Sequence, residues 1–354
     1  TPAILEAANG IIENNSDRLG KVLRTPTGSS AHRGRNVRVL KNRDEVEESR
    51  KIGMLLIEHV AAGVHLDEIA ILYRTNALSR TFEDELRRLA LPYRVVGGQR
   101  FYDRKEIKDV IATLRLVFNR KSDVDALRFF AAVPRGLGDK TIEKISATAK
   151  RRGRSILEVF ASDELLKESD LNTAGQAKCR AVITLLDDLL ERIGRKAFDF
   201  PADLFAAPSR EGVPQADLFA PQKEPDDKKA VLGAAKALAL VMDKMGLTDR
   251  LEAEQSEEAA GRLENLQELV NAAARFEEEQ KRQGAGHDIT AFLEQTALAS
   301  TADEDADNDN GRGKVTLMTL HSAKGLEFDA VFIAGLEEHA FRHSRALQKD
   351  EPLG

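Results

Sequence analysis

The sequence predicts an α/β protein whose parallel sheet is interrupted by a large all-α insertion. Strand-like runs occur in the first hundred residues and again after residue 313. The stretch between them, from about residue 104 to about residue 300, is dominated by helical periodicity. Because strands occur on both sides of this helical stretch, the simplest architecture is one sheet assembled from two separated segments.

The first segment reads as strand, helix, strand, helix, strand. Residues 36–41 alternate in polarity like a half-buried strand, and residues 43–62 have the pattern of a helix. Residues 69–73 are a continuous apolar run, which is typical of a strand buried on both faces, and residues 93–97 predict a third strand. The second helix is marked by apolar residues at spacings of four, four and three: Leu78, Phe82, Leu86 and Leu89.

The same kinds of apolar pattern predict helices in the middle of the chain and strands near its end. Helices are expected at 123–132 and from residue 139 onward. A longer helix is marked by one apolar stripe: Leu263, Leu266, Leu269, Val270, Ala273 and Phe276. Strand composition returns at 314–319 and at 330–334. This order predicts that the last two strands join the sheet begun before the insertion.

Two segments read as loops. Residues 201–225 contain five of the ten prolines, so we expect them to be extended. Residues 302–310 are acidic, and they fit a linker that leads back into the sheet.

Charge is unevenly distributed along the chain. The net charge of −6 excludes a uniformly basic nucleic-acid binder, but residues 101–155 hold 14 Lys/Arg against 7 Asp/Glu. Residues 251–310 hold 4 basic against 16 acidic side chains and would repel phosphate. On charge alone, the basic region is either a phosphate-facing surface or a solvated helix face.

Other chemistry is limited by composition. The single cysteine, Cys179, excludes an intrachain disulfide and a cysteine-based metal site. There is neither an apolar run long enough to span a membrane nor a signal-peptide pattern, so a cytoplasmic location is expected. No phosphate-binding loop of the Gly-x4-Gly-Lys-Ser/Thr type is present.

The string Thr-Leu-His-Ser-Ala-Lys-Gly-Leu-Glu-Phe at 319–328 is the most informative in the chain. It lies between two predicted strands, where α/β folds place ligands. Its hydroxyl, imidazole, ammonium and carboxylate groups can together grip a phosphodiester and accept hydrogen bonds from a ribose. The side chains concerned are those of Thr319, His321, Ser322, Lys324 and Glu327.

This string resembles a conserved motif of superfamily-1 DNA helicases of the UvrD, PcrA and Rep type. Further strings similar to that family occur in order: 71–80, 93–109, Pro134-Arg135-Gly136-Leu137-Gly138-Asp139 and Arg262-Leu263-Glu264-Asn265-Leu266. The resemblance weakens only at 195–228 and 300–312. It implies a RecA-like domain, called 2A, split by a helical domain, called 2B.

The resemblance implies domain boundaries and a fragment. Residues 1–103 and 313–354 would form domain 2A, and residues 104–312 domain 2B, with a flexible insert at about 198–228 and an acidic linker at about 300–312. The family's phosphate loop and Mg²⁺ carboxylates (Walker A and B) and its second arginine motif (motif VI) are absent from this chain. We therefore expect no ATPase activity from the chain alone.

The function implied is that of an ATP-dependent DNA helicase translocating 3′ to 5′ in DNA repair or replication. ATP and Mg²⁺ would serve the whole enzyme. Its partners would be single-stranded DNA and the junctions of single-stranded with duplex DNA, together with the sliding clamp and repair proteins. Two alternatives stay open: a non-catalytic module that binds DNA and partners, and a subunit of a helicase–nuclease.

Residue roles follow from matching positions. Arg74 and Asn76 would line the single-stranded DNA path, as would Thr319, His321, Ser322 and Lys324, while Gly325 and Glu327 would bind ATP through its ribose. For Asn76 a helix N-cap is an equally good interpretation. Tyr73 and the pair Ser79-Arg80 are expected to be structural.

Duplex contacts are implied around a Gly-x-Gly turn that feeds a helix, where backbone N–H groups can bind phosphate. The residues are Gly136, Leu137, Gly138, Lys140 and Thr141, with Lys108 as a further contact. Without the resemblance, a C-cap glycine followed by Asp139 as N-cap would explain the turn as well.

Gln215-Ala216-Asp217-Leu218-Phe219, in the proline-rich insert, resembles the peptide by which bacterial replication and repair proteins bind the sliding clamp. The Leu218-Phe219 pair can fill an apolar pocket while Gln215 bonds at its rim, and Asp217 completes the motif. A chance pentapeptide, or a segment packed back on the helical domain, would look the same.

Overall fold

The structure is a computed structural model that describes residues 1–13, 22–24, 34–133, 137–194, 232–284, 289–305 and 313–336. The chain divides into two compact units, residues 1–51 and 52–354. In the first unit, α1 (Pro2–Glu13) is tied to residues 22–24. The Asn9 amide donates to the Leu23 carbonyl and accepts from its N–H, both at 3.0 Å.

The strand predicted at 36–41 is wrong. These residues belong to no strand or sheet. Val37 and Val39 are 54% and 83% exposed, so the alternating pattern has no buried face to satisfy. The helix expected at 43–62 is present as α2 (Glu45–Ala61), which begins with an acidic first turn.

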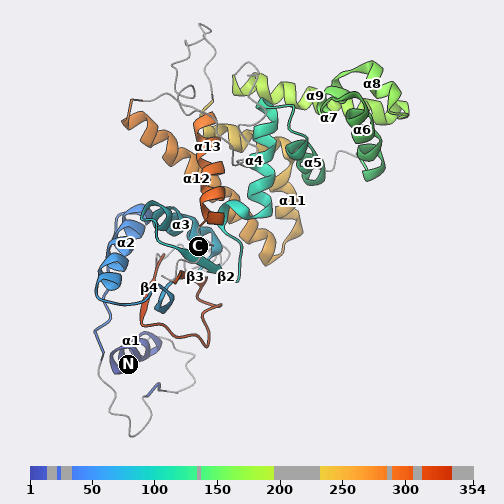
Figure 1. Ribbon diagram of the computed structural model, residues 1–354. Coiled ribbons are helices and arrows are strands. Elements are labelled where there is room, and N and C mark those ends of the chain that lie inside the picture. Colours follow the sequence, from blue (N-terminus) through green and yellow to red (C-terminus); the bar gives the residue numbers. More distant parts are fainter. Residues whose placement is uncertain are drawn as a thin grey trace, which may run out of the picture. The chain divides into compact units, whose positions relative to one another are not determined.

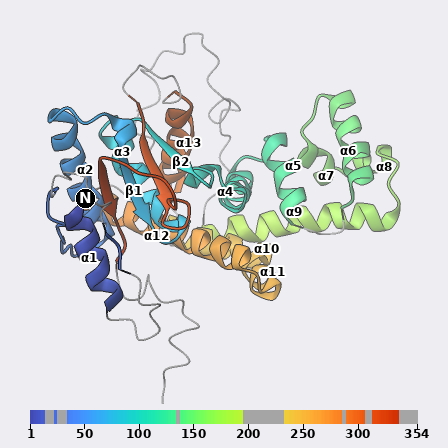
Figure 2. The same cartoon turned by 90° about the horizontal axis from the view of Figure 1, so that it is seen from below.

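The second unit contains a four-stranded parallel sheet in the order β2-β3-β1-β4 (Figures 1 and 2). Its strands are β1 (Ile69–Tyr73), β2 (Tyr93–Val96), β3 (Val315–Thr319) and β4 (Ala330–Ile333). Ala70 is in register with Thr316 on one side and with Val331 on the other. Two segments more than 200 residues apart therefore share one sheet, as the sequence predicts.

One face of the sheet is covered by α2 and α3 (Ser79–Arg88) (Figure 2). Alternate residues of β1 point into this layer, where Ile69 and Tyr73 are fully buried against Leu56 of α2 and Leu86 of α3. The side chains between them point to the opposite face, where Leu72 packs on the loop that follows β3. All five β1 residues are buried, which explains their continuous apolar run.

The remaining helices form a second apolar core. Their bounds are α4 (Lys105–Phe118), α5 (Asp123–Ala132), α6 (Asp139–Arg152), α7 (Ile156–Ala161), α8 (Asp163–Glu168), α9 (Thr173–Ile193), α10 (Ala234–Met245), α11 (Leu247–Glu254), α12 (Glu257–Arg282) and α13 (Ile289–Asp305). Figure 2 shows α6, α7 and α8 gathered at one end of α9. The stripe predicted for α12 is confirmed, because Leu266, Leu269 and Ala273 are buried in this core.

The fold class is therefore confirmed: a parallel α/β sheet interrupted by a large helical insertion. Among the described residues, no helix combines the length and apolarity needed to cross a membrane. The two apolar cores are separate clusters. Hydrogen bonds from Arg80 to Glu268 and from Arg104 to Asn265 join α12 to the elements around the sheet.

Candidate nucleic-acid interface

The carboxyl ends of three parallel strands open onto one cleft of about 700 Å³. On the sheet side, the cleft is lined by residues that follow β1, β2 and β3. These residues are Arg74, Thr75, Asn76, Gly98, Gln99, Thr319 and His321. We call them the sheet wall. The carboxyl edge of a parallel sheet is where α/β folds bind ligands, so this cleft is the candidate site.

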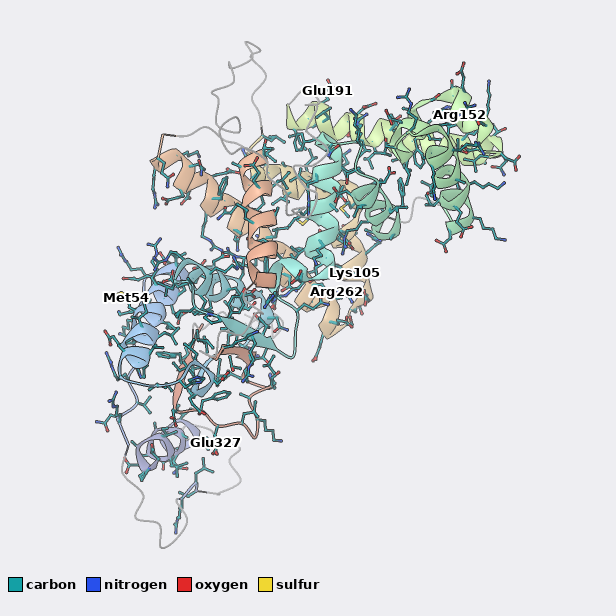
Figure 3. The ribbon with its side chains drawn as sticks, viewed as in Figure 1. Met54, Lys105, Arg152, Glu191, Arg262 and Glu327 are labelled. Carbon is teal, nitrogen blue, oxygen red and sulfur yellow. The ribbon has the colours of Figure 1, made fainter. Side chains whose placement is uncertain are left out.

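The opposite side of the cleft comes from the first turns of α4 and α12. We call it the helical wall: Arg104, Lys105, Glu106, Glu257, Glu258, Ala260, Gly261, Arg262, Glu264 and Asn265. Figure 3 labels Lys105 and Arg262, which come from the two different helices. Arg262 is paired with Glu258 at 2.5 Å.

Asn76 presents an unsatisfied polar atom beside the cleft. It begins a 3₁₀ turn, Asn76–Leu78, whose N-cap is Thr75 and has no side-chain cap bond. The Asn76 Oδ1 atom is buried and has no hydrogen-bond partner among the described residues. The helix-cap interpretation is therefore wrong for Asn76. A buried amide oxygen without a partner is costly.

The loop after β3 is held by its own hydroxyl groups. Thr319 Oγ1 and Ser322 Oγ are 2.9 Å apart, and Thr319 Oγ1 accepts from the Ser322 N–H at 3.3 Å. A Cβ on Gly97 would lie 2.9 Å from Ser322 Oγ, so Ser322 packs closely on the backbone after β2. Ser322 thus supports the loop, whereas His321 is exposed and lines the cleft.

The predicted strand-binding residues divide into two groups. The structure brings Arg74, Asn76, Thr319 and His321 together in the sheet wall. Ser322 and Lys324 lie on the same loop but do not line the cleft. The sequence alone did not predict the helical wall.

The residues predicted to bind ATP lie further along the loop between β3 and β4. Gly325 has a φ of +87°, and a Cβ there would meet nothing within 4 Å, so its backbone is open to close approach. Glu327, which is labelled in Figure 3, is exposed. An exposed carboxylate beside an open backbone can accept hydrogen bonds from sugar hydroxyls, so these residues fit a nucleotide ribose.

A buried polar network stands behind the sheet wall. Glu83 is fully buried and accepts from the Ser79 hydroxyl at 2.6 Å and from the Phe101 N–H at 3.1 Å. Burial raises the pKa of Glu83. Burial also lowers the pKa of Arg104, which donates to Ser79 Oγ at 2.7 Å. Tyr73, Ser79 and Arg80 are buried as well, as is expected of residues with structural roles.

The predicted duplex contacts lie at the start of α6. Gly136 is outside the described residues. Gly138 is the N-cap of α6, so Asp139 is not, and a Cβ on Gly138 would meet nothing within 4 Å. Lys140 is exposed, Thr141 is half-buried and Leu137 packs on the helical core.

Several nearby cations have acidic partners. Lys108 pairs with Asp103 at 2.6 Å, and Lys144 pairs with Asp170 at 3.0 Å. Arg151 and Arg152 both pair with Glu168 at 3.0 Å. The clamp-like residues Gln215, Asp217, Leu218 and Phe219 lie outside the described residues. In the part of the chain that the structure describes, no group of His, Cys, Asp and Glu side chains could hold a metal ion.

Comparison with known proteins gives a consistent result. A family model described as the UvrD-like helicase C-terminal domain matches residues 1–352. The ATP-dependent DNA helicase PcrA of Staphylococcus epidermidis is 32% identical over 351 residues, which cover 99% of this chain and 41% of that protein. PcrA of Bacillus subtilis is 32% identical over 357 residues, or 100% and 42% of the two chains. The chain thus spans about two fifths of the length of these relatives.

Proposed function

Because this chain belongs to the UvrD-like helicase C-terminal domain family, we propose that it is the strand-binding part of an ATP-dependent DNA helicase that acts in repair or replication. The observation that carries the proposal is the sheet wall. Residues from two loops 245 positions apart, Arg74 with Asn76 and Thr319 with His321, converge on one cleft. A guanidinium, an unpaired amide oxygen and an imidazole there suit the phosphates and base edges of single-stranded DNA.

Nucleotide would bind on the loop between β3 and β4. Glu327 would accept hydrogen bonds from the ribose, and His321, six residues earlier, would contact the strand. One short loop would then link the two ligands, so a change at the nucleotide would move the strand contact. Bound ATP would supply the free energy for translocation, which we propose runs 3′ to 5′. No group of described residues fits Mg²⁺, so its ligands would come from elsewhere in the whole protein.

The start of α6 would bind duplex DNA. Backbone N–H groups at the open Gly138 turn, with the exposed Lys140, suit phosphate oxygens at the positive end of a helix. Residues 1–103 with 313–354, and residues 104–312, would act as domains 2A and 2B. This division separates a strand-binding sheet from a duplex-binding helical arm.

The proposal is tested by binding this chain to a fluorescent duplex with a 3′ single-stranded tail across a salt series. Single-stranded DNA and blunt duplex are the comparison ligands. We expect tight binding to the tailed duplex that weakens steeply with salt. His321→Ala should weaken binding to the single strand, and Gly138→Glu binding to the duplex, each with little effect on the other ligand. Equal loss of both ligands in both variants would contradict the assignment of two separate surfaces.

A further inference from the structure

One guanidinium connects three of the segments that line the cleft. Arg104 is 6% exposed and makes four hydrogen bonds. It donates to the carbonyl oxygens of Asn76 at 2.9 Å and Gln99 at 3.2 Å. It also donates to Asn265 Oδ1 and to Ser79 Oγ, both at 2.7 Å. Three of these acceptors belong to residues that line the cleft: Asn76, Gln99 and Asn265.

The contact with α12 is held in a single orientation. The Asn265 Nδ2 group donates to Glu106 Oε1 at 2.6 Å, so its Oδ1 atom is left to face Arg104. Both Asn265 and Glu106 are buried. The pair therefore fixes how the first turns of α12 meet those of α4, and Arg104 extends that connection to the sheet wall.

Arg104 is also supported from behind. Its guanidinium lies 5.1 Å from the centre of the Phe101 ring, in a cation–π contact. Ser79, which accepts from Arg104, donates in turn to the buried Glu83 carboxylate at 2.6 Å. A lysine could not make the same contacts, because one ammonium group cannot reach four acceptors that surround a planar guanidinium in different directions.

We propose that Arg104 is a positioning residue of the strand-binding site. It holds the loops after β1 and β2 against α12, so that Asn76 and Gln99 keep their places in the sheet wall. Arg104 acts through Asn76 and Gln99 and need not touch DNA itself. This inference rests on the proposed function, because it concerns how the same site is built.

The chain offers a matched control. Arg80 is also 6% exposed and also reaches α12, through Glu268 at 2.6 Å. Its partners, Glu268 and Asp84, do not line the cleft. Replacing either arginine by lysine thus disturbs the contact with α12, but only Arg104→Lys disturbs the segments of the cleft.

The experiment compares Arg104→Lys with Arg80→Lys in the full chain, measuring the unfolding midpoint and the affinity for a fluorescent single-stranded oligonucleotide. We expect both variants to lower the midpoint. Only Arg104→Lys should weaken DNA binding, by about tenfold, which is the loss of one or two hydrogen bonds. Equal DNA affinities in the two variants would overturn the proposal.

Double variants separate a positioning role from a general loss of structure. If Arg104 acts through Asn76, then Asn76→Ala should weaken binding much less in the Arg104→Lys background than in the original chain. Additive losses would refute that route. Should Arg104→Lys fail to fold, Asn265→Ala provides the test: it removes one acceptor, keeps Arg104, and should weaken binding by a few-fold. Unchanged DNA affinity in Asn265→Ala would then overturn the proposal.

A failure of the proposed function would give a different set of DNA affinities from a failure of the positioning role. If Arg74→Ala and Asn76→Ala leave DNA affinity unchanged, the sheet wall does not bind the strand at all. If those variants weaken binding and Arg104→Lys does not, the strand site stands and only the positioning role is refuted.

Discussion

The two walls of the cleft differ in their content of charged side chains. The sheet wall contains no carboxylate, and its Asn76 amide oxygen has no partner among the described residues. The helical wall contains four carboxylates, those of Glu106, Glu257, Glu258 and Glu264. Its Arg262 is already paired with Glu258. Because the two walls differ in this way, a charged polymer in the cleft should bind in one preferred orientation.

This difference indicates which part of a strand each wall would face. Phosphates gain from Arg74 on the sheet wall, whereas on the helical wall four carboxylates offset the charges of Arg104, Lys105 and Arg262. Carboxylates and amides can instead accept hydrogen bonds from the amino groups of bases. We therefore expect the DNA backbone to follow the sheet wall, with bases turned toward α12.

The largest effect is expected at Arg74. Arg74→Ala removes the guanidinium of the sheet wall, and a charge-assisted hydrogen bond contributes about 1.5–3 kcal/mol. The dissociation constant for single-stranded DNA should rise about 10- to 100-fold, measured by fluorescence anisotropy.

The control for Arg74→Ala is Arg88→Ala. Arg88 lies on α3 outside the cleft and pairs with Glu85 at 2.7 Å, with its side chain 59% exposed. Its removal should leave DNA affinity unchanged. An equal loss from both substitutions would mean that general positive charge, and not the sheet wall, binds the strand.

The next effect comes from two adjacent glycines after β2. A Cβ on Gly98 would lie 3.6 Å from Asn76 Oδ1, an ordinary contact that leaves the fold intact but covers the unpaired acceptor. Gly98→Ala should therefore weaken DNA binding several-fold with little change in the unfolding midpoint. The measurement is DNA affinity beside thermal unfolding.

Gly97→Ala should behave in the opposite way. Gly97 has a φ of +77°, and its Cβ would meet Ser322 Oγ at 2.9 Å. The strain should destabilise the chain by about 1 kcal/mol or more and displace the loop that carries His321. If Gly98→Ala destabilised the chain more than Gly97→Ala, the described backbone after β2 would be wrong.

A smaller effect of opposite sign is expected on the helical wall. Replacing Glu257, Glu258 and Glu264 together by glutamine removes three negative charges that face the cleft. DNA affinity should rise by a few-fold at low salt, and the gain should disappear near 1 M salt, where the screening length is about 3 Å. A loss of affinity would show that these carboxylates bind the strand directly.

Four residues of the sheet wall, Arg74, Asn76, Thr319 and His321, could be predicted from the sequence, and the helical wall could not. Strands at 69–73 and 314–319 are short apolar runs, and polar residues directly after such strands meet at one sheet edge whatever the rest of the fold does. The helical wall depends on α12 packing beside that edge, a contact between residues 161 positions apart. Local sequence patterns do not predict contacts between residues so far apart in the sequence.

The sequence contains one local indication of the contact between α12 and the sheet edge, but it does not identify the partner residue. Asn265 stands four residues before Leu269, on the apolar stripe of α12, where a polar residue requires a buried partner. The apolar stripe does not predict which residue is that partner; in the structure it is Arg104, which donates to Asn265 Oδ1. The strand predicted at 36–41 failed for a related reason: its alternation implied a buried face that Val37 and Val39 do not have.

The smallest effect lies behind the sheet wall and concerns stability. Burial raises the pKa of Glu83 above its ordinary value of 4.5. The folded chain then holds a proton that the unfolded chain has released, so stability present below pH 4.5 is lost as pH rises through the folded pKa. Glu83→Gln cannot titrate, and its stability relative to the original chain should increase over that range, as measured by urea unfolding at several pH values.

Glu168 gives the control of opposite sign for Glu83. Hydrogen bonds from Arg152, together with the charge of Arg151, lower the pKa of Glu168. Its contribution to stability is present above the unfolded pKa and is lost as pH falls through the folded one, so Glu168→Gln should flatten the acid side of the curve. DNA affinity should not change in Glu168→Gln. If Glu83→Gln followed the same slope as Glu168→Gln, the carboxylate behind the sheet wall would be stabilised by its ion pairs more than it is penalised by burial.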